Sequence, residues 1–258
     1  MQMTPSRVLA KLRAGKVASC TGLNMSCSRA ASIAAMTGFD CLWLGREHRP
    51  NDLSVIEKQI LATKEFGADT VVRVPRGSYS DYIHPLEMDA TGIMVPHVMS
   101  AADARNVVQM TRFYPIGRRP IDGGNADGRY CSIPMAEYVE QANRERFVMI
   151  QIEDPEPLDE LDEICSIDGI DIVFFGPGDF SHAIGDLGKF TDPRIDKARR
   201  QIAETAIRHG RFAGTVAGPA NIKEIYDIGY RFIAMGADVL GYGAYCKEQF
   251  AHFGCLPD

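Results

Sequence analysis

Short apolar runs alternate along this chain with longer stretches in which apolar residues recur at helical spacing. Eight of the runs are rich in β-branched and aromatic residues, as buried β-strands are. They cover residues 17–23, 40–44, 70–74, 92–95, 147–152, 170–175, 212–216 and 231–235. Several runs, such as residues 147–150, are apolar at every position, which is typical of parallel strands covered on both faces.

The stretches between the runs carry signals for helix starts. Ser100 can cap a helix that follows it, and Pro193 occupies a favourable first helical position after Asp192. Eight strands alternating with helices predict an α/β fold, a single (β/α)8 TIM barrel. A doubly wound open sheet would need a Gly-rich dinucleotide turn after its first strand, and residues 21–26 lack that turn.

Length and composition agree with one soluble domain spanning residues 1–258. Barrels of this kind need about 250 residues. Hydrophobic residues make up 45% of the chain and charged residues 24%, which excludes the composition typical of disorder. The net charge of -6, with scattered Lys and Arg, provides no basic stripe for a phosphate backbone, so we expect no nucleic-acid partner.

Two further patterns bear on location. No apolar run approaches the roughly 18 to 20 residues that cross a bilayer, and the first residues do not form a secretion signal, so we expect no membrane association. The seven cysteines include no CxxC pair, which argues against a disulfide framework and a zinc–thiolate site. A reducing cytoplasm fits this pattern best.

Candidate chemistry collects where the apolar runs end, because TIM-barrel active sites lie at the carboxyl ends of the strands. Five run ends carry candidate residues that should converge on one mouth. These residues are Glu47, His48, Arg73, Pro96, His97, Glu153, Gly176, Gly178 and Asp179. No lysine lies clearly at a run end for a Schiff base, and no Ser, Cys and His form a nucleophilic arrangement.

Two of these residues suit a metal ion. Glu153 and Asp179 are 26 positions apart, about one strand–helix unit, which predicts neighbouring strand ends. Mg²⁺ or Mn²⁺ typically takes one or two protein carboxylates and leaves its other positions to water and substrate oxygens, such as those of a 2-oxo acid. Both acids could instead stabilise or cap a helix start, but the spacing and the barrel position favour the metal site.

The remaining candidates suit substrate binding and proton transfer. The turn from Gly176 through Gly178 to Asp179 brings a flexible backbone to a helix start, where free N–H groups can hold a carboxylate. Arg73 could stabilise an enolate or carbonyl oxygen, although a salt-bridged rim arginine would fit the same position. His48 is the natural base because imidazole titrates near neutrality, although a lone histidine is more often structural.

Other histidines and one long loop complete the candidates. His97 is the reserve base, whereas His84 and His182 are interpreted as rim or packing residues. Residues 117–130 form the one long loop-like stretch, and such loops are often functional covers.

In order, these segments resemble the HpcH/HpaI family over nearly the whole chain. The matching motifs are Gly38-Phe-Asp, Glu47-His-Arg-Pro-Asn-Asp, Val72-Arg, Gly92-Ile-Met-Val-Pro, Tyr114-Pro-Ile-Gly-Arg-Arg, Gln151-Ile-Glu, Gly176-Pro-Gly-Asp-Phe-Ser and Arg231-Phe-Ile-Ala-Met-Gly. The resemblance implies a class II aldolase on a TIM barrel that uses Mg²⁺, Mn²⁺ or Co²⁺ to handle pyruvate and an aldehyde.

The resemblance also implies roles for individual residues. Glu153 and Asp179 would bind the metal, Arg73 would steady the pyruvate oxygen, and His48 would shuttle the proton of the aldol hydroxyl. It further implies a hexamer built from dimers that exchange their last helix, here predicted over residues 238–250, with the sites near subunit boundaries.

Three segments depart from the family pattern. Gly45 stands where relatives commonly have an aspartate associated with the metal's water shell, and we expect it to leave extra room beside the metal. In the segment from Leu86 to Ala90, Glu87 stands where the acid partner of the catalytic histidine is usually Asp, and Asp89 follows it. We expect Glu87, one methylene longer, to reach His48. The 119–124 loop also differs from the Arg-Gly that relatives favour.

The expected reaction is reversible cleavage of a 4-hydroxy-2-oxo acid to pyruvate and an aldehyde. Decarboxylation of an oxaloacetate-type acid, or another lyase reaction through the same enolate, is the nearest alternative. A catalytically reduced barrel that binds a small acid as a sensor or scaffold is an alternative from another class.

Overall fold

The computed structural model describes residues 1–255. Its eight strands are all parallel and close into a barrel in the order in which they occur along the chain, which confirms the predicted TIM barrel. The strands are β1 (Ala18–Gly22), β2 (Cys41–Gly45), β3 (Asp69–Arg73), β4 (Gly92–Val95), β5 (Phe147–Ile152), β6 (Ile172–Phe175), β7 (Phe212–Val216) and β8 (Phe232–Ala237). Each coincides with a predicted strand to within two residues at either end.

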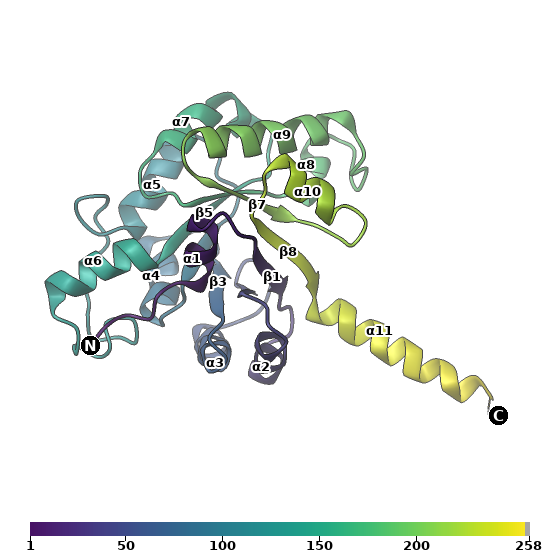
Figure 1. The fold of residues 1–258 in the computed structure, drawn as a ribbon, viewed down its shortest axis with the longest axis horizontal. Coiled ribbons are helices and arrows are strands. Elements are labelled where there is room, and N and C mark those ends of the chain that lie inside the picture. The colour runs from purple at the N-terminus through teal and green to yellow at the C-terminus, as the bar shows by residue number, and fades with distance from the viewer. Residues whose placement is uncertain (256–258) are drawn as a thin grey trace.

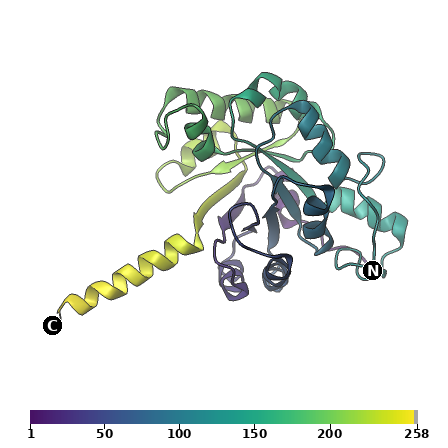
Figure 2. The same cartoon turned by 180° about the vertical axis from the view of Figure 1, so that it is seen from behind.

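Most helices surround the barrel on its outside, whereas α1 (Arg7–Arg13) packs against the side chains that fill its interior and α11 (Asp238–Ala251) projects away from it (Figures 1 and 2). The other helices are α2 (Ser28–Met36), α3 (Leu53–Lys64), α4 (Tyr79–Glu87), α5 (Ala101–Thr111), α6 (Met135–Glu145), α7 (Leu161–Ser166), α8 (Pro177–Ala183), α9 (Pro193–Arg208) and α10 (Ile222–Ile228), with short 3₁₀ turns at Glu156–Glu160 and His252–Cys255. Both predicted helix starts are confirmed, because the side chain of Ser100 accepts the backbone N–H of Asp103 at the start of α5, and Pro193 is the first residue of α9.

Alternation along each strand divides the core into two shells. On β2, Cys41 belongs to the cluster inside the barrel, whereas Leu42 and Leu44 pack outward against the helices. On β5, Phe147 and Met149 face inward in the same way. Successive strand residues point to opposite faces, so the same alternation decides which residue just beyond a strand faces the mouth.

The barrel interior is filled by side chains of complementary size. At Gly92 on β4, an added Cβ would overlap the ring of Phe147 on the neighbouring β5. The missing side chain at one position therefore makes room for the large side chain at the other. Phe147 also packs against Phe232, with 6.5 Å between the ring centroids.

Buried ion pairs lie at the amino end of the barrel. Arg146, just before β5, contacts Asp89, just before β4, at 2.6 Å, and Lys64 reaches the same carboxylate at 2.6 Å. Arg119 pairs with Asp127 at 3.0 Å, and both side chains are almost fully buried. These charged groups therefore lie in closed clusters away from solvent.

The long loop of residues 117–130 lies at this same amino end, between α5 and α6. Its Asp127 backbone N–H donates to the carbonyl of Glu87 at the end of α4, and its Asp127 side chain accepts from Tyr138 at 2.7 Å. The loop was predicted to cover a functional site. For the site expected at the carboxyl ends of the strands in the same chain, this prediction is wrong. Within one chain it packs beneath the strands.

The last helix, α11, projects away from the barrel (Figure 1). In the described structure none of its side chains is buried, and Leu240, Tyr242 and Phe250 are 68%, 61% and 77% exposed. Beside its first turn lies a mostly apolar groove of about 670 Å³, lined by residues that include Leu23, Ala34 and others from β1, α2 and β8. Among the helices of residues 1–255, none has both the length and the apolar character that crossing a membrane requires.

Candidate active site at the carboxyl end of the barrel

Glu153 points into the mouth because it continues the alternation of β5. It lies one residue beyond the strand and has the same parity as Phe147 and Met149, which face the interior. Its Oε1 accepts the backbone N–H of His97 at 2.9 Å, and its Oε2 accepts Nε2 of Gln151 at 2.5 Å. The carboxylate is only 1% exposed, so hydrogen bonds rather than water hold it in place.

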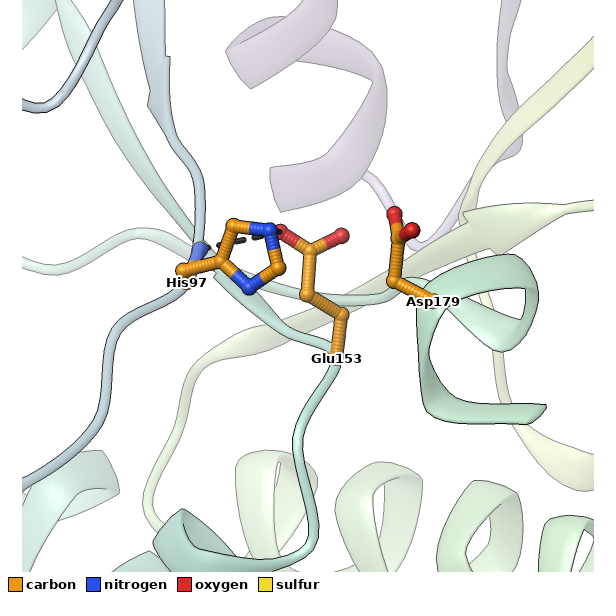
Figure 3. A group of neighbouring side chains, drawn as sticks. All are labelled: His97, Glu153 and Asp179. Carbon is orange, nitrogen blue, oxygen red and sulfur yellow. Dashed lines mark hydrogen bonds and ion pairs between the residues drawn. The ribbon is translucent and has the colours of Figure 1, made fainter. Parts of the chain in front are cut away.

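Three side chains lie close enough together to hold one ion (Figure 3). One potential ligand atom from each of His97, Glu153 and Asp179 lies within 4.8 Å of the other two. They come from the ends of β4, β5 and β6, so the predicted convergence of Glu153 and Asp179 is present and His97 joins it. Two carboxylate oxygens and one imidazole nitrogen form a donor set that suits a divalent cation.

The electrostatics of this group also fit a cation. The pKa of Glu153 is raised to about 7, because the effects of burial and of the Asp179 charge outweigh the lowering by the hydrogen bond from His97 and by the charges of His97 and Arg73. A buried carboxyl group beside a second carboxylate is costly to ionise without a nearby positive charge. A bound cation would supply that charge and favour the ionised form.

His97 is oriented by a neighbouring acid. Its Nδ1 lies 2.8 Å from Oδ2 of Asp154, and a carboxylate can only accept, so Nδ1 carries the proton. Nε2 then faces Oε1 of Glu153 at 3.7 Å and Oε1 of Glu47 at 4.0 Å. Burial lowers the pKa of His97, but the hydrogen bond to Asp154 and the nearby carboxylates outweigh it and raise the pKa.

Glu47 connects the other predicted residues to this group. Its Oε2 lies 2.9 Å from Nε of Arg73, in an ion pair without hydrogen-bond geometry, and 3.5 Å from Nε2 of His48. The guanidinium of Arg73 stacks over the ring of Trp43, 5.0 Å from its centroid. Arg73 is thus mostly buried at the end of β3, whereas the side chain of His48 is 64% exposed at the rim.

Sequence reasoning underrated two of these residues. The sequence places Glu47 at a strand end without a role, and it does not single out Trp43. Trp43 packs against Phe174 inside the barrel with 5.6 Å between the ring centroids, and the guanidinium of Arg73 lies over its ring. The adjacent Glu47-His48 pair was the available signal, because two titratable residues directly after a strand share one rim.

The turn after β6 has the predicted form. At Gly176, an added Cβ would lie 2.6 Å from Oε2 of Glu153, so this glycine makes room for the buried carboxylate. At Gly178, an added Cβ would meet no atom of the described chain within 4 Å. Asp179 lies in the first turn of α8, and no side chain of the described residues caps that helix start.

Two expectations about the departures from the family pattern are corrected. Glu87 ends α4 at the amino side of β4, where it lines a pocket of about 430 Å³ with His84 and Asp122, so it does not reach His48 within one chain. Burial raises the pKa of Glu87 in this pocket. Gly45 leaves no empty space, because an added Cβ would lie 2.5 Å from Nη1 of Arg49.

Comparisons with known proteins agree with this geometry. Residues 23–242 match the family model described as HpcH/HpaI aldolase/citrate lyase. A 2-keto-3-deoxy-L-rhamnonate aldolase of Escherichia coli is 33% identical over 249 residues, which cover 94% of this chain and 91% of the relative. A hydroxypyruvate/pyruvate aldolase of Cupriavidus necator is 32% identical over 232 residues, covering 90% and 86%.

A solved structure extends the similarity to three dimensions. The crystal structure of an HpcH/HpaI aldolase from Desulfitobacterium hafniense superposes with a TM-score of 0.90 at 27% sequence identity. The match covers 97% of both chains, so the barrel and its last helix have counterparts along nearly the whole length.

Proposed function

Because this chain belongs to the HpcH/HpaI aldolase/citrate lyase family, we propose that residues 1–258 form one lyase domain, a divalent-metal-dependent aldolase of 4-hydroxy-2-oxo acids. The products of cleavage are pyruvate and an aldehyde. The observation that carries this proposal is the convergence of Glu153, Asp179 and His97 beside Arg73 in one mouth. The names of two aldolase relatives that align with most of the chain support the reaction class.

Glu153 and Asp179 would hold the cation, and Nε2 of His97 is positioned as a third donor. When bound, a divalent cation acts as a Lewis acid on the 2-oxo group of the substrate. Mg²⁺ and Mn²⁺ suit the carboxylates, whereas an imidazole donor would favour Co²⁺ or another transition metal. Comparing metals in wild type and in His97→Ala decides whether the histidine contributes.

The chain's own residues would bind the oxo acid and move the proton. Glu47 holds Nε of Arg73, which leaves the terminal guanidinium nitrogens for the 2-oxo oxygen, where negative charge develops. In cleavage, His48 takes the proton of the 4-hydroxyl group as the bond between C3 and C4 breaks. The electron pair of that bond stays on the pyruvate fragment as an enolate, which then takes a proton at its methyl carbon.

The turn after β6 would receive the substrate carboxylate. The backbone at Gly176 and Gly178 leads into α8, and N–H groups at a helix start favour an anion. Asp179 lies in the same turn, so the groups proposed for cation and substrate adjoin one another. This arrangement would orient the 2-oxo acid toward Arg73.

Pyruvate release across a panel of hydroxy-oxo acids tests the function. We expect metal-dependent release from at least one 4-hydroxy-2-oxo acid and its loss after exhaustive chelation. Faster release from oxaloacetate than from every hydroxy-oxo acid would instead identify a decarboxylase. Binding of a 2-oxo acid without turnover of any panel member would identify a catalytically reduced barrel.

We also propose that the chain is a cytoplasmic homo-oligomer built from dimers, up to a hexamer, which exchange α11. The exposed apolar residues of α11 and the neighbouring apolar groove support this assembly, as do the seven free cysteines for a reducing compartment. In such an assembly Glu87 could serve His48 only across a subunit boundary. Light scattering at working concentration tests the assembly, and a monomer would contradict it.

A further inference from the structure

Arg49 occupies the space that Gly45 leaves at the end of β2. Gly45 has the parity of Cys41, which faces the barrel interior, so the direction of its missing side chain is into the mouth. An added Cβ there would lie 2.5 Å from Nη1 of Arg49 and 3.0 Å from its Cδ and Cζ. The guanidinium of Arg49 therefore lies over the mouth, against the backbone of β2.

Polar contacts hold Arg49 in this place but leave one nitrogen without a partner. Its Nη2 donates to Oδ1 of Asn24 at 2.9 Å, and Nδ2 of Asn51 donates to the carbonyl of Gly45 at 2.9 Å. Nη1 is shielded from solvent and finds no hydrogen-bond acceptor within residues 1–255. An unpaired charged donor in a shielded position is costly unless a ligand satisfies it.

Two nearby carboxylates, those of Asp238 and Glu47, already interact with other groups. Asp238, at the start of α11, accepts the backbone N–H groups of Asn24 at 2.7 Å and Met25 at 2.9 Å. Glu47 forms an ion pair with Nε of Arg73 at 2.9 Å. Arg49 and Arg73 therefore both lie on the side of the mouth formed by β1, β2 and β3, and the groups that suit a cation come from the ends of β4, β5 and β6.

Burial, and secondarily the positive charge of Arg73, lower the pKa of Arg49, whereas Asp238 partly offsets them. This direction agrees with the geometry, because burial removes water from Nη1 and no acceptor among the described residues replaces it. An arginine remains charged at any physiological pH, so its fork of N–H groups stays available for a carboxylate.

We propose that Arg49 is a specificity-determining residue that binds the carboxylate of an anionic acceptor, an aldehyde or oxo acid that carries a negative charge. The inference rests on the proposed aldolase function. Pyruvate would use Arg73 and the groups at the ends of β5 and β6, which leaves the β1 to β2 side for the acceptor. Gly45 contributes to the same site, because a side chain at this position would displace the guanidinium of Arg49.

Aldol addition of pyruvate to a matched pair of acceptors tests the proposal. Succinic semialdehyde carries a carboxylate, and its primary amide has nearly the same shape without the charge. We expect wild type to prefer the charged acceptor, and Arg49→Gln to lower kcat/KM for that acceptor about ten- to a hundredfold, with less than about a threefold change for the amide. Arg200→Gln, an exposed arginine on α9, is the control and should change neither value.

Gly45→Ala tests whether the position of the Arg49 guanidinium matters as well as its charge. The new Cβ should displace the guanidinium while the arginine remains, and so reduce the preference in the same direction as Arg49→Gln. Circular dichroism melting of each variant shows whether the fold is retained. Arg49→Lys keeps the charge without the planar fork, so it should restore part of the preference.

Three results would overturn the proposal. Equal decreases in kcat/KM for both acceptors would mean that Arg49 does not distinguish the charged acceptor from the neutral one. Slower exchange of pyruvate methyl protons in Arg49→Gln would assign the residue to the donor. If calorimetry shows that succinate binds equally to wild type and Arg49→Gln, Arg49 forms no anion site. If succinate binding depends on Arg49 but no substrate turns over, the aldolase function is contradicted and the anion site is supported.

Discussion

The two ends of this barrel treat buried charge in opposite ways. At the amino end, Arg146 and Asp89, and Arg119 and Asp127, form pairs in which both partners are shielded from water and bonded to each other. At the carboxyl end, Glu153 is buried beside a second carboxylate, and Nη1 of Arg49 has no acceptor among the described residues. The amino-end charges neutralise each other in pairs, whereas a buried carboxylate beside a second carboxylate is a candidate ligand site.

The same scaffold therefore separates stability from chemistry along one axis. Removing a charged side chain at the amino end should lower the free energy of unfolding and leave kcat nearly unchanged. Removing one at the carboxyl end should lower kcat and change the free energy of unfolding little. Substitutions at each end test this separation directly.

The largest expected effect is at the candidate metal site. Glu153→Gln keeps the shape but removes the charge, so it should lower the affinity for Mn²⁺ and reduce pyruvate release by more than about a thousandfold. Asp179→Asn should follow it, and exhaustive chelation should abolish turnover in wild type. Calorimetry with Mn²⁺ and a coupled assay of pyruvate give the two readouts. Glu163→Gln, on the exposed face of α7, is the matched control, and full turnover after chelation would refute the metal requirement.

The next effect is at the amino end. Arg146→Ala leaves the carboxylate of Asp89 short of a partner, and breaking such a buried pair should lower the free energy of unfolding by about 3 to 5 kcal/mol. Urea unfolding measures this loss. At a low temperature, where the variant stays folded, its kcat should remain within about threefold of the wild-type value. Arg144→Ala, on an exposed pair of α6, should cost less than about 0.5 kcal/mol. A large fall in kcat for folded Arg146→Ala would remove the contrast between the two ends.

The third effect divides the reaction within the carboxyl end. His48→Ala should slow aldol cleavage about a hundredfold, because proton transfer by a positioned side chain contributes that much, and should leave exchange of pyruvate methyl protons nearly unchanged. Proton magnetic resonance in D₂O follows the exchange. Equal damage to both steps would give His48 another role. Glu87→Ala is the companion variant, and cleavage at the wild-type rate would show that Glu87 and His48 do not act as a pair.

The smallest effect concerns the pH dependence of stability at the amino end. Burial tends to raise the pKa of Asp40, but hydrogen bonds from Lys11 and Ser19 outweigh it and hold the pKa below its ordinary value. A carboxylate with a lowered pKa in the folded state stabilises the fold above its ordinary pKa of about 4, and this contribution disappears as the pH falls through the folded value.

Asp40→Asn should therefore lower the free energy of unfolding by about 1 to 2 kcal/mol above pH 5, and the difference from wild type should shrink below pH 4. Urea unfolding at a series of pH values gives both curves. Asp227→Asn, an exposed residue paired with Lys223, is the control. Parallel curves for wild type and Asp40→Asn would mean that its charge does not stabilise the fold.

The strands and the carboxylates of the site could be predicted from the sequence because both follow from local order. An apolar run defines each strand, and the parity of β5 places Glu153 in the mouth. The position of Arg49 could not be predicted in the same way, since it depends on how the loop after β2 folds back over Gly45. His97, which adopts a φ of 47° after Pro96, likewise reaches its neighbours only through the shape of its loop.

The close approach of Phe147 to Gly92 constrains how this barrel can change over evolutionary time. A side chain introduced at Gly92 would collide with the ring, so that mutation cannot come first. Shrinking Phe147 first opens a cavity, which typically costs about 3 to 5 kcal/mol and must be tolerated until a second mutation fills it. The two positions are therefore epistatic, and lineages that depart from this pair must pass through a less stable ancestor.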